Sequence, residues 1–344
     1  MTARRAGFAV VAALAALVLH AGPAGADPPR PTDYRSTVTG FDPATGVVRA
    51  EIVGGDTFLQ LTVDDGHEVV VDGYNREPYL RFRADGTVER NRHSPATYLN
   101  ESRTGQVTLP AEADEEARPD WERVGSGGTY TWHDHRIHWM GAGRPQGLQP
   151  GDKVQDWTVS LVVDGTPAKI TGTLVLAEGV SPLPWVVLGL VAAGLVVLVG
   201  RRHPLRAAPA AVFVAAAGAM VAGTAQYRLV PDGAGANPLL MAVPAAGLGL
   251  SAVALGLRGR SPAVPVTLAA AAAVIGWAVL RAPVLWKPVL PTDLPYALDR
   301  GLTAAALGLA LAAAGLVVWG GGLAVATPHP ATASTAAGGG TPAA

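Results

Sequence analysis

Five long apolar segments in the second half of the sequence constrain the fold of this 344-residue chain more than any other feature. They cover residues 185–199, 207–225, 238–257, 263–280 and 301–319, and they consist mainly of Ala, Val, Leu and Gly. A helix of about 20 apolar residues is long enough to cross the hydrocarbon core of a bilayer. We therefore predict an all-α transmembrane bundle of five helices over residues 185–319.

Small residues recur in these segments at helical spacing. Gly218 and Ala222 are four residues apart, and Gly247, Gly249 and Ala252 form a similar group, so we expect close helix contacts there. No Asp, Glu, Lys, Arg or His lies near the middle of any segment. Ion pathways and proton relays normally need such groups. This disfavours a secondary transporter, although backbone or Thr donors could line a neutral pathway.

The part of the chain before residue 180 carries most of the charge and has a different pattern. Short runs rich in Val, Thr, Phe, Tyr and Trp alternate with Gly-containing turns, which is typical of β-strands. The runs cover residues 37–41, 47–53, 58–63, 68–71, 79–82, 129–132, 154–163 and 169–176. We predict an all-β domain over residues 27–180, with an immunoglobulin-like sandwich favoured over a closed barrel.

The two ends of the chain predict its placement. Residues 1–26 combine Arg4 and Arg5, an apolar stretch and an Ala-Gly-Ala site, which is typical of a secretory signal peptide; an uncleaved signal anchor is the alternative. We therefore expect an extracytoplasmic β-domain, a plasma-membrane bundle and a cytoplasmic C-terminus. Arg-rich turns at residues 201–206 and 258–260 then face the cytoplasm. Residues 326–344, rich in Ala, Thr, Gly and Pro, are predicted to be disordered.

Composition excludes several kinds of site. The chain has no cysteine, so it has no disulfide, no thiolate nucleophile and no Cys-ligated metal. Its net charge of -1 is not accompanied by a basic stripe, and nucleic acid is not an expected partner. Linear motifs of hydrolases, metalloproteases and nucleotide-binding enzymes are absent, so no catalytic residue is predicted and an enzyme is disfavoured.

The strongest functional signal is the histidine run of residues 130–140 in the β-domain. It contains His133, His135 and His138 between aromatic residues. In an extended strand His133 and His135 would project from one face, and a bend at residues 134–136 would fold the run into a hairpin and bring His138 to them. Asp134 would be a fourth ligand or the acceptor that fixes an imidazole tautomer.

Imidazole donors without thiolates favour Cu(II) or Zn(II) as the bound ion. Copper has a slight advantage because Met140 and the flanking Trp residues are similar to the soft and shielding groups of exported copper-handling proteins. The competing interpretation is that the three histidines are structural and form hydrogen bonds inside an aromatic core. His67 and His93 would add ligands only if the fold brings them close.

Two further segments lead to open alternatives. Residues 90–119 are polar and predict a long irregular loop, either functional or a mobile insertion. Residues 283–300, between the last two apolar segments, are rich in Pro and aromatic side chains. Such a segment is typical of an anchor at the membrane interface, and docking onto the exported domain is the alternative.

The plan of an exported β-domain followed by a multi-span bundle resembles that of bacterial copper-resistance proteins of the CopC-CopD type. Residues 132–139, Trp-His-Asp-His-Arg-Ile-His-Trp, are similar to a block of uncharacterised actinobacterial envelope proteins. The CopC family uses a histidine at the mature N-terminus, where this chain has Asp27. We expect a membrane-anchored divalent-metal-binding protein, or alternatively a non-enzymatic envelope interaction or sensory protein with an envelope protein as partner.

Overall fold

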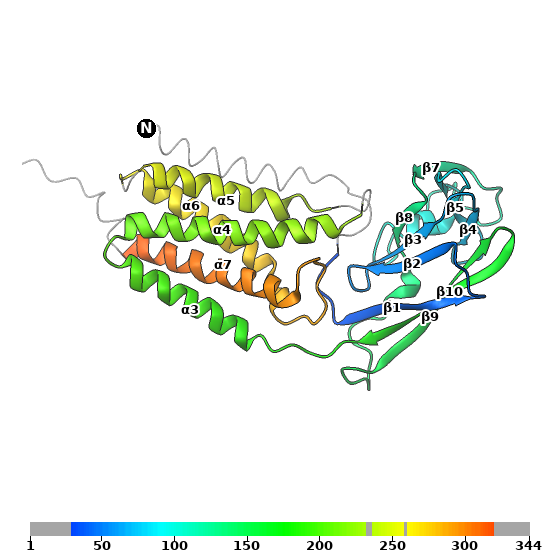
Figure 1. The fold of residues 1–344 in the computed structure, drawn as a ribbon, viewed down its shortest axis with the longest axis horizontal. Helices are drawn as coiled ribbons and strands as arrows, with labels where there is room; N and C mark the ends of the chain where they lie inside the picture. Colours follow the sequence, from blue (N-terminus) through cyan, green and yellow to red (C-terminus); the bar gives the residue numbers. More distant parts are fainter. Residues whose placement is uncertain (1–28, 232–235, 258–259, 320–344) are drawn as a thin grey trace, which may run out of the picture.

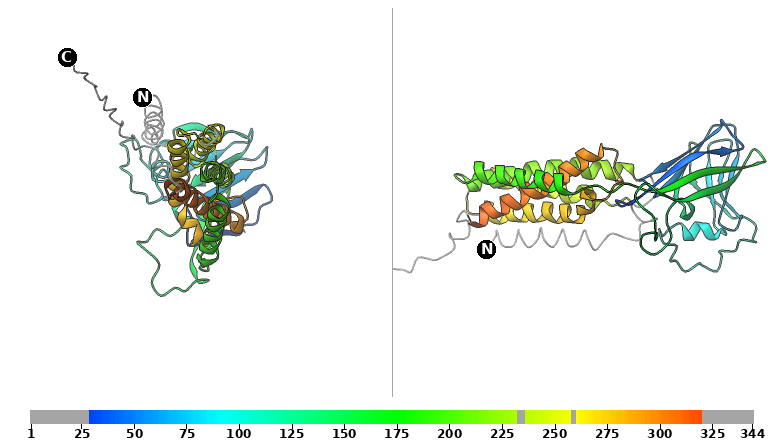
Figure 2. Two further views of the ribbon diagram at one scale, coloured as in Figure 1. Left: turned by 90° about the vertical axis from the view of Figure 1, so that its left-hand side faces the viewer. Right: turned by 90° about the horizontal axis from the view of Figure 1, so that it is seen from below.

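The computed structural model describes residues 29–231, 236–257 and 260–319. Within these ranges a β-sheet domain of ten strands precedes a helical bundle. Figure 1 shows the β-domain at one end of the bundle, and Figure 2 shows the two parts end to end along the long axis. The predicted signal peptide (1–26) and tail (326–344) lie outside the described residues.

The strands form two antiparallel sheets, in the orders β1-β10-β9-β4-β5-β6-β7 and β2-β3-β8. The larger sheet consists of Tyr34–Asp42 (β1), Val69–Asp72 (β4), Pro78–Phe82 (β5), Val88–Asn91 (β6), Trp121–Gly125 (β7), Lys153–Val163 (β9) and Thr166–Leu176 (β10). The smaller sheet consists of Val48–Val53 (β2), Phe58–Val63 (β3) and Thr129–His133 (β8). The all-β prediction is confirmed at this level, and the immunoglobulin-like sandwich stays a prediction.

Alternating side chains of both sheets build one shared core. In β9, for example, Trp157, Val159 and Leu161 are buried while the residues between them are more exposed. Leu59 and Leu61 of β3 bring the smaller sheet into the same cluster. Successive side chains of a strand point to opposite faces, so this period of two places one apolar row against the facing sheet.

The prediction of an irregular segment over residues 90–119 is wrong at its first two residues, which belong to β6, and at a short helix, α2 (Pro95–Leu99). Strands β6 and β7 flank the irregular part, and α2 lies inside it. These strands lack an apolar alternation because charge pairs replace it. Arg81 binds Glu89 across β5 and β6 at 2.6 Å, and Arg90 faces Glu122 across β6 and β7 at 3.5 Å. Opposite charges at facing positions stabilise neighbouring strands as apolar pairs do.

In the part of the chain that the structure describes, five helices are long and apolar enough to cross a membrane. They are Leu183–Gly200 (α3), Pro204–Leu229 (α4), Leu239–Gly256 (α5), Ala263–Leu280 (α6) and Tyr296–Val317 (α7). Each coincides with one of the five predicted spans, so the prediction of a five-helix bundle is confirmed. A 3-10 helix, η2 (Ala282–Leu285), lies in the connection between α6 and α7.

Small residues allow the helices to pack closely, but not all at the predicted positions. A Cβ atom on Gly308 of α7 would lie 2.1 Å from the carbonyl oxygen of Gly189 in α3. A Cβ atom on Gly223 of α4 would lie 2.0 Å from the carbonyl oxygen of Leu240 in α5. Gly249, expected at a contact, has open space beside it. The closest approaches therefore join α3 to α7 and α4 to α5 through Gly at backbone contacts.

A buried polar network holds the ends of α4, α6 and α7 that lie nearest the β-domain. Arg281, which caps α6, donates to Asp299 in the first turn of α7 at 2.6 Å and also to Gln226 of α4. Gln226 in turn donates to the carbonyl oxygen of Pro29 at 3.2 Å. The Arg281 and Asp299 side chains are 5% and 0% exposed. The charged groups absent from the middle of each span are thus present, paired, at one end of the bundle.

We predict that Arg281→Ala lowers the free energy of unfolding by about 3–5 kcal/mol, because it leaves the Asp299 carboxylate buried without its cation. Combining Arg281→Met with Asp299→Leu should recover most of this loss, since no charge then remains to be desolvated. Thermal unfolding of the detergent-solubilised chain measures both. The exposed pair of Lys153 and Asp156 supplies the control, because Lys153→Ala should cost about 1 kcal/mol or less. Equal losses for Arg281→Ala and Lys153→Ala would contradict the prediction.

The connection between α6 and α7 docks onto the β-domain. Val289 forms an isolated antiparallel bridge with Thr32, with N···O distances of 3.0 and 3.2 Å. Lys287, two residues before Val289, pairs with Asp33, the residue after Thr32. Arg300 donates from α7 to the carbonyl oxygens of residues 284, 287 and 288 and so fixes the shape of the connection. Of the two alternatives for residues 283–300, docking is the one that the structure supports.

Paired cysteines can test this docking, because the chain has none of its own. Residues that exchange both hydrogen bonds in an antiparallel pair have Cα atoms about 5.5 Å apart, which suits a disulfide. We predict that a Thr32→Cys, Val289→Cys variant cross-links on mild oxidation in membranes, as seen by a mobility shift on non-reducing gels. Thr39→Cys with Val289→Cys should not, because Thr39 lies about 20 Å further along the chain in extended conformation. Similar yields for both pairs would argue against the docked arrangement.

Candidate functional site

The histidine run does not continue as an extended strand. Strand β8 ends at His133, and residues His135–Ile137 form a 3-10 helix, η1. Asp134 begins this turn, and its carboxylate accepts a hydrogen bond from the backbone N–H of Arg136 at 3.0 Å. Asp is a favoured residue at the start of a helical turn for this reason. The expected projection of His133 and His135 from one strand face is therefore wrong, and a 3-10 turn takes the place of the expected hairpin.

Asp134 is fully buried and belongs to an ion pair. Its two oxygens accept from the guanidinium of Arg136 at 2.8 and 2.7 Å, and one of them also accepts from the indole of Trp132 at 2.9 Å. Burial raises the pKa of the Asp134 carboxyl, but the charge and hydrogen bonds of Arg136 and the bond from Trp132 outweigh it and hold the pKa below its usual value. Within the described part of the chain, the hydrogen bonds of the Asp134 carboxylate come from Arg136 and Trp132 and not from an imidazole, in contrast to the expected role.

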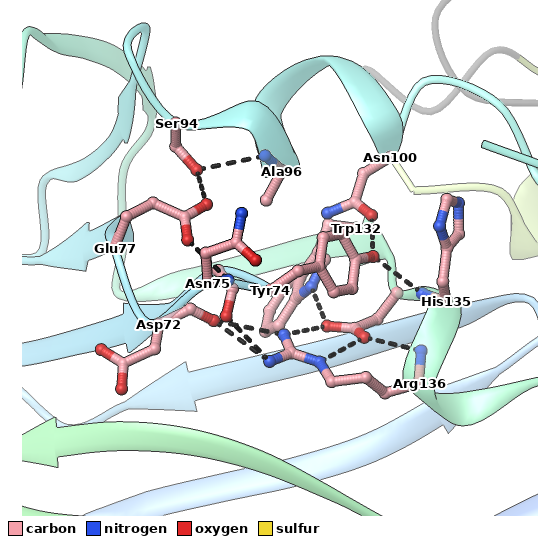
Figure 3. Close-up of polar contacts among 12 residues, drawn as sticks. Asp72, Tyr74, Asn75, Glu77, Ser94, Ala96, Asn100, Trp132, His135 and Arg136 are labelled. Atoms are coloured by element: carbon pink, nitrogen blue, oxygen red, sulfur yellow. Dashed lines mark hydrogen bonds and ion pairs between the residues drawn. The ribbon is translucent and has the colours of Figure 1, made fainter. Parts of the chain in front are cut away.

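Arg136 and Tyr74 connect this ion pair to the larger sheet, as Figure 3 shows. Arg136 donates to the carbonyl oxygens of Asp72 at 3.2 Å and of Gly73 at 3.4 Å, just after β4. The Tyr74 ring lies over the guanidinium, 5.1 Å from it. The Tyr74 hydroxyl accepts from the backbone N–H of His135 at 2.9 Å. The position of η1 is thus set by contacts to the β4–β5 connection.

The three imidazoles do lie together. The ring centroid of His138 is 5.5 Å from that of His135 and 6.0 Å from that of His133. Both ring pairs meet edge to face. His133 also packs against Phe58 at 4.8 Å. His133 and His138 are 1% exposed, and His135 is half-buried. The structure therefore gathers His133, His135 and His138 through a bend where one was expected, but the bend is a 3-10 turn and not a hairpin.

Two of the imidazoles donate to neighbouring carbonyl groups of the loop that follows α2. The distance from Nε2 of His135 to the Ser102 oxygen is 2.8 Å, and from Nε2 of His138 to the Arg103 oxygen it is 2.9 Å. Because a carbonyl oxygen only accepts, both Nε2 atoms carry the proton, and in the neutral ring Nδ1 holds the lone pair. Within the described residues, no hydrogen bond reaches the buried Nδ1 of His138.

The charge state of His138 follows from its surroundings. Burial, reinforced by the nearby charge of Arg103, lowers the pKa of His138 to about 3. The ring is therefore neutral over the physiological range, the form in which an imidazole binds metal ions. The residues that the structure describes contain no group of three or more His, Cys, Asp or Glu side chains already placed to hold a metal ion.

The other candidate histidines have different partners. His67 binds the Asp164 carboxylate at 2.7 Å near the turn between β9 and β10. His93 binds the carbonyl oxygen of Arg118 at 2.7 Å. Both contacts are exposed, and neither His67 nor His93 takes part in the ring contacts of the cluster. They are thus not expected to complete a site with the histidine cluster.

Sequence analysis missed the groups that position the cluster. Tyr74, Ser102 and Arg103 belong to two segments far from the histidine run in the sequence, and two of them act through backbone carbonyl oxygens. A carbonyl oxygen is present at every residue, so it leaves no sequence signal. Gly105 is one indirect sign, because a Cβ atom there would lie 2.8 Å from the His135 ring.

Comparison with known proteins adds no assignment to this geometry. No family model, curated protein or solved structure matches the chain.

The Asp134–Arg136 pair leads to a prediction about the stability of the β-domain. Arg136→Ala should lower the free energy of unfolding by about 3–5 kcal/mol, because the Asp134 carboxylate then remains buried without its cation. Unfolding followed by Trp fluorescence measures the change. The matched control is Arg49→Ala, which removes an exposed pair with Asp64 and should cost about 1 kcal/mol or less. A loss below about 1 kcal/mol for Arg136→Ala would show that the pair does not hold η1 in place.

Proposed function

We propose that this chain is a membrane-anchored, extracytoplasmic protein that binds a divalent transition metal through the imidazoles of His133, His135 and His138. The observation that carries the proposal is the pair of hydrogen bonds from Nε2 of His135 and His138 to the carbonyl oxygens of residues 102 and 103. Metal-binding histidines almost always donate their second N–H to such an acceptor, which fixes the tautomer and the ring orientation.

The spacing of the rings supports the same proposal. With metal–nitrogen bonds of about 2.0–2.1 Å, two imidazoles on one tetrahedral ion have ring centroids roughly 5 Å apart. The rings of His135 and His138 are already at 5.5 Å, and His133 is 6.0 Å from His138. The centroid separations of these two ring pairs are thus within about 1 Å of the value expected for a shared ion. Asp134 is left out of the proposed ligand set, because Arg136 and Trp132 occupy both of its oxygens.

Cu(II) and Zn(II) are the ions that fit three nitrogen donors in a chain without thiolates. Met140 lies two residues beyond His138 and is exposed, so copper keeps its slight advantage. We propose that the β-domain, expected to be an immunoglobulin-like sandwich, lies outside the plasma membrane with the C-terminus in the cytoplasm. The bundle then serves as the anchor.

A second candidate is a non-enzymatic envelope interaction or sensory protein in which the histidines are structural. The same two hydrogen bonds favour it, because they attach the loop at residues 100–105 to η1. The stacking of His135 on Tyr74, with ring centroids 5.5 Å apart, supports the same role. In this case the loop and an envelope protein partner, not an ion, would be the functional elements.

A metal titration of the full chain in nanodiscs separates the two candidates. We expect stoichiometric binding of Cu(II) or Zn(II) by calorimetry and its loss in the His133→Ala, His135→Ala, His138→Ala variant. The His67→Ala, His93→Ala variant should bind as the unchanged chain does, since these histidines have other partners. The metal proposal fails if the unchanged chain binds neither ion, or if the triple variant binds equally well. The structural candidate predicts either of these two outcomes. It also predicts a lower unfolding temperature for the triple variant.

A further inference from the structure

The turn between β2 and β3, residues 54–57, touches both the bundle and the support of the histidine cluster. Gly55 has φ +83 and lies against the docked connection, so that a Cβ atom there would be 2.4 Å from Cγ1 of Val289. The next residue, Asp56, is fully buried and pairs with Arg103 at 2.6 Å. Two adjacent residues of one tight turn thus contact the bundle and the loop at residues 100–105.

Arg103 connects the β2–β3 turn to the histidine cluster. Its guanidinium binds Asp56, and its carbonyl oxygen accepts the hydrogen bond from Nε2 of His138 at 2.9 Å. Burial raises the pKa of the Asp56 carboxyl, and the charge of Arg103 opposes that rise. A buried carboxylate next to a guanidinium resists separation, because each charge left alone would be desolvated without compensation. A shift of the turn should therefore carry Arg103 with it.

Phe58 provides a second, parallel contact from the same hairpin. It is the first residue of β3 and is fully buried. On one side it packs with Val230, which caps the C-terminal end of α4. On the other side its ring lies 4.8 Å from that of His133. The bundle therefore reaches two of the three histidines through adjoining positions of a single β-hairpin.

The bundle side of these contacts is firmly held. Val289 forms both backbone hydrogen bonds with Thr32, and Arg300 of α7 fixes the carbonyl oxygens just before it. A rearrangement of the α6–α7 connection that moves Val289 would disturb its contact with Gly55. Packed interiors of this kind shift between discrete arrangements and do not deform continuously.

We propose that the β2–β3 turn couples the conformation of the membrane bundle to the histidine cluster, with Asp56 and Arg103 as positioning residues for His138. A change in the α6–α7 connection alters the Arg103 carbonyl and hence the orientation and accessibility of the His138 ring. By reciprocity, a change at the cluster alters the bundle. That this coupling regulates metal affinity rests on the proposed function, whereas the coupling itself does not.

Chemical modification of His138 by diethylpyrocarbonate tests the coupling without any metal. The full chain in nanodiscs is treated with the reagent, and the modification rate of His138 is followed by peptide mass spectrometry. We expect Val289→Ala, a mild change on the bundle side, and Gly55→Ala, on the turn, each to raise the rate about fivefold or more, the lower end of typical coupling between sites.

Two matched controls separate coupling from general loosening. Gly66→Ala introduces a side chain at a similar φ of +88 but into open space. Val284→Ala truncates an equally buried valine of the same connection that packs in a cluster formed by the bundle and its connections. Both controls should leave the His138 rate within about twofold of the unchanged chain, below the usual range of coupling.

The proposal is overturned if Val289→Ala leaves the His138 rate unchanged, or if either control raises it as much as Val289→Ala does. Should Gly55→Ala fail to fold, Val289→Ala alone decides the outcome. The result is independent of the metal titration. A chain that binds no ion but shows the expected rates would retain the coupling and lose only the metal function.

Discussion

The buried carboxylate of Asp134 is the group on which the arrangement of the histidine cluster depends. It begins the 3-10 turn that ends β8, and it binds the guanidinium that reaches across to the β4–β5 connection. A strand continuing past His133 would place His138 on the opposite face from His133 and His135. Because the carboxylate stabilises a turn instead, the His138 ring contacts the rings of both His133 and His135. The negative charge of Asp134 thus has a geometric role, because it holds the turn that brings the imidazoles together.

The bundle and the β-domain form a continuous unit through a small set of specific contacts. The bridge between Thr32 and Val289 adds a strand-like contact from the α6–α7 connection to the β-domain. The network of Gln226, Arg281 and Asp299 lies at the same end of the bundle and reaches the backbone of Pro29. At this end of the bundle Arg281 pairs with Asp299, and Arg300 donates to carbonyl oxygens of the α6–α7 connection.

The elements that sequence analysis predicted correctly are those whose own residues determine them. Helices α3 to α7 follow from apolar length alone, and β9 follows from the alternation around Val159. Strands β6 and β7 were missed because their stability comes from charge pairs with neighbouring strands, such as Arg81 with Glu89, which are visible only once the strands are paired. The identity of the clustered histidines was predictable, but their geometry was not. The carbonyl oxygens that orient them belong to residues about 30 positions earlier in the chain.

The hydrogen bonds that fix His135 and His138 are compatible with either a metal site or a structural core. The two roles differ in what the other ring nitrogen, Nδ1, binds. A purely structural imidazole gains stability when both nitrogens are bonded, because an unpaired buried nitrogen forfeits a hydrogen bond with water. Within the described residues Nδ1 of the buried His138 has no such partner. An ion bound there would cost little tautomer or rotamer reorganisation, since the carbonyl groups of Ser102 and Arg103 have already selected the ring form that binds metals. Under the proposed function, Nδ1 of His138 is the atom that an ion would engage.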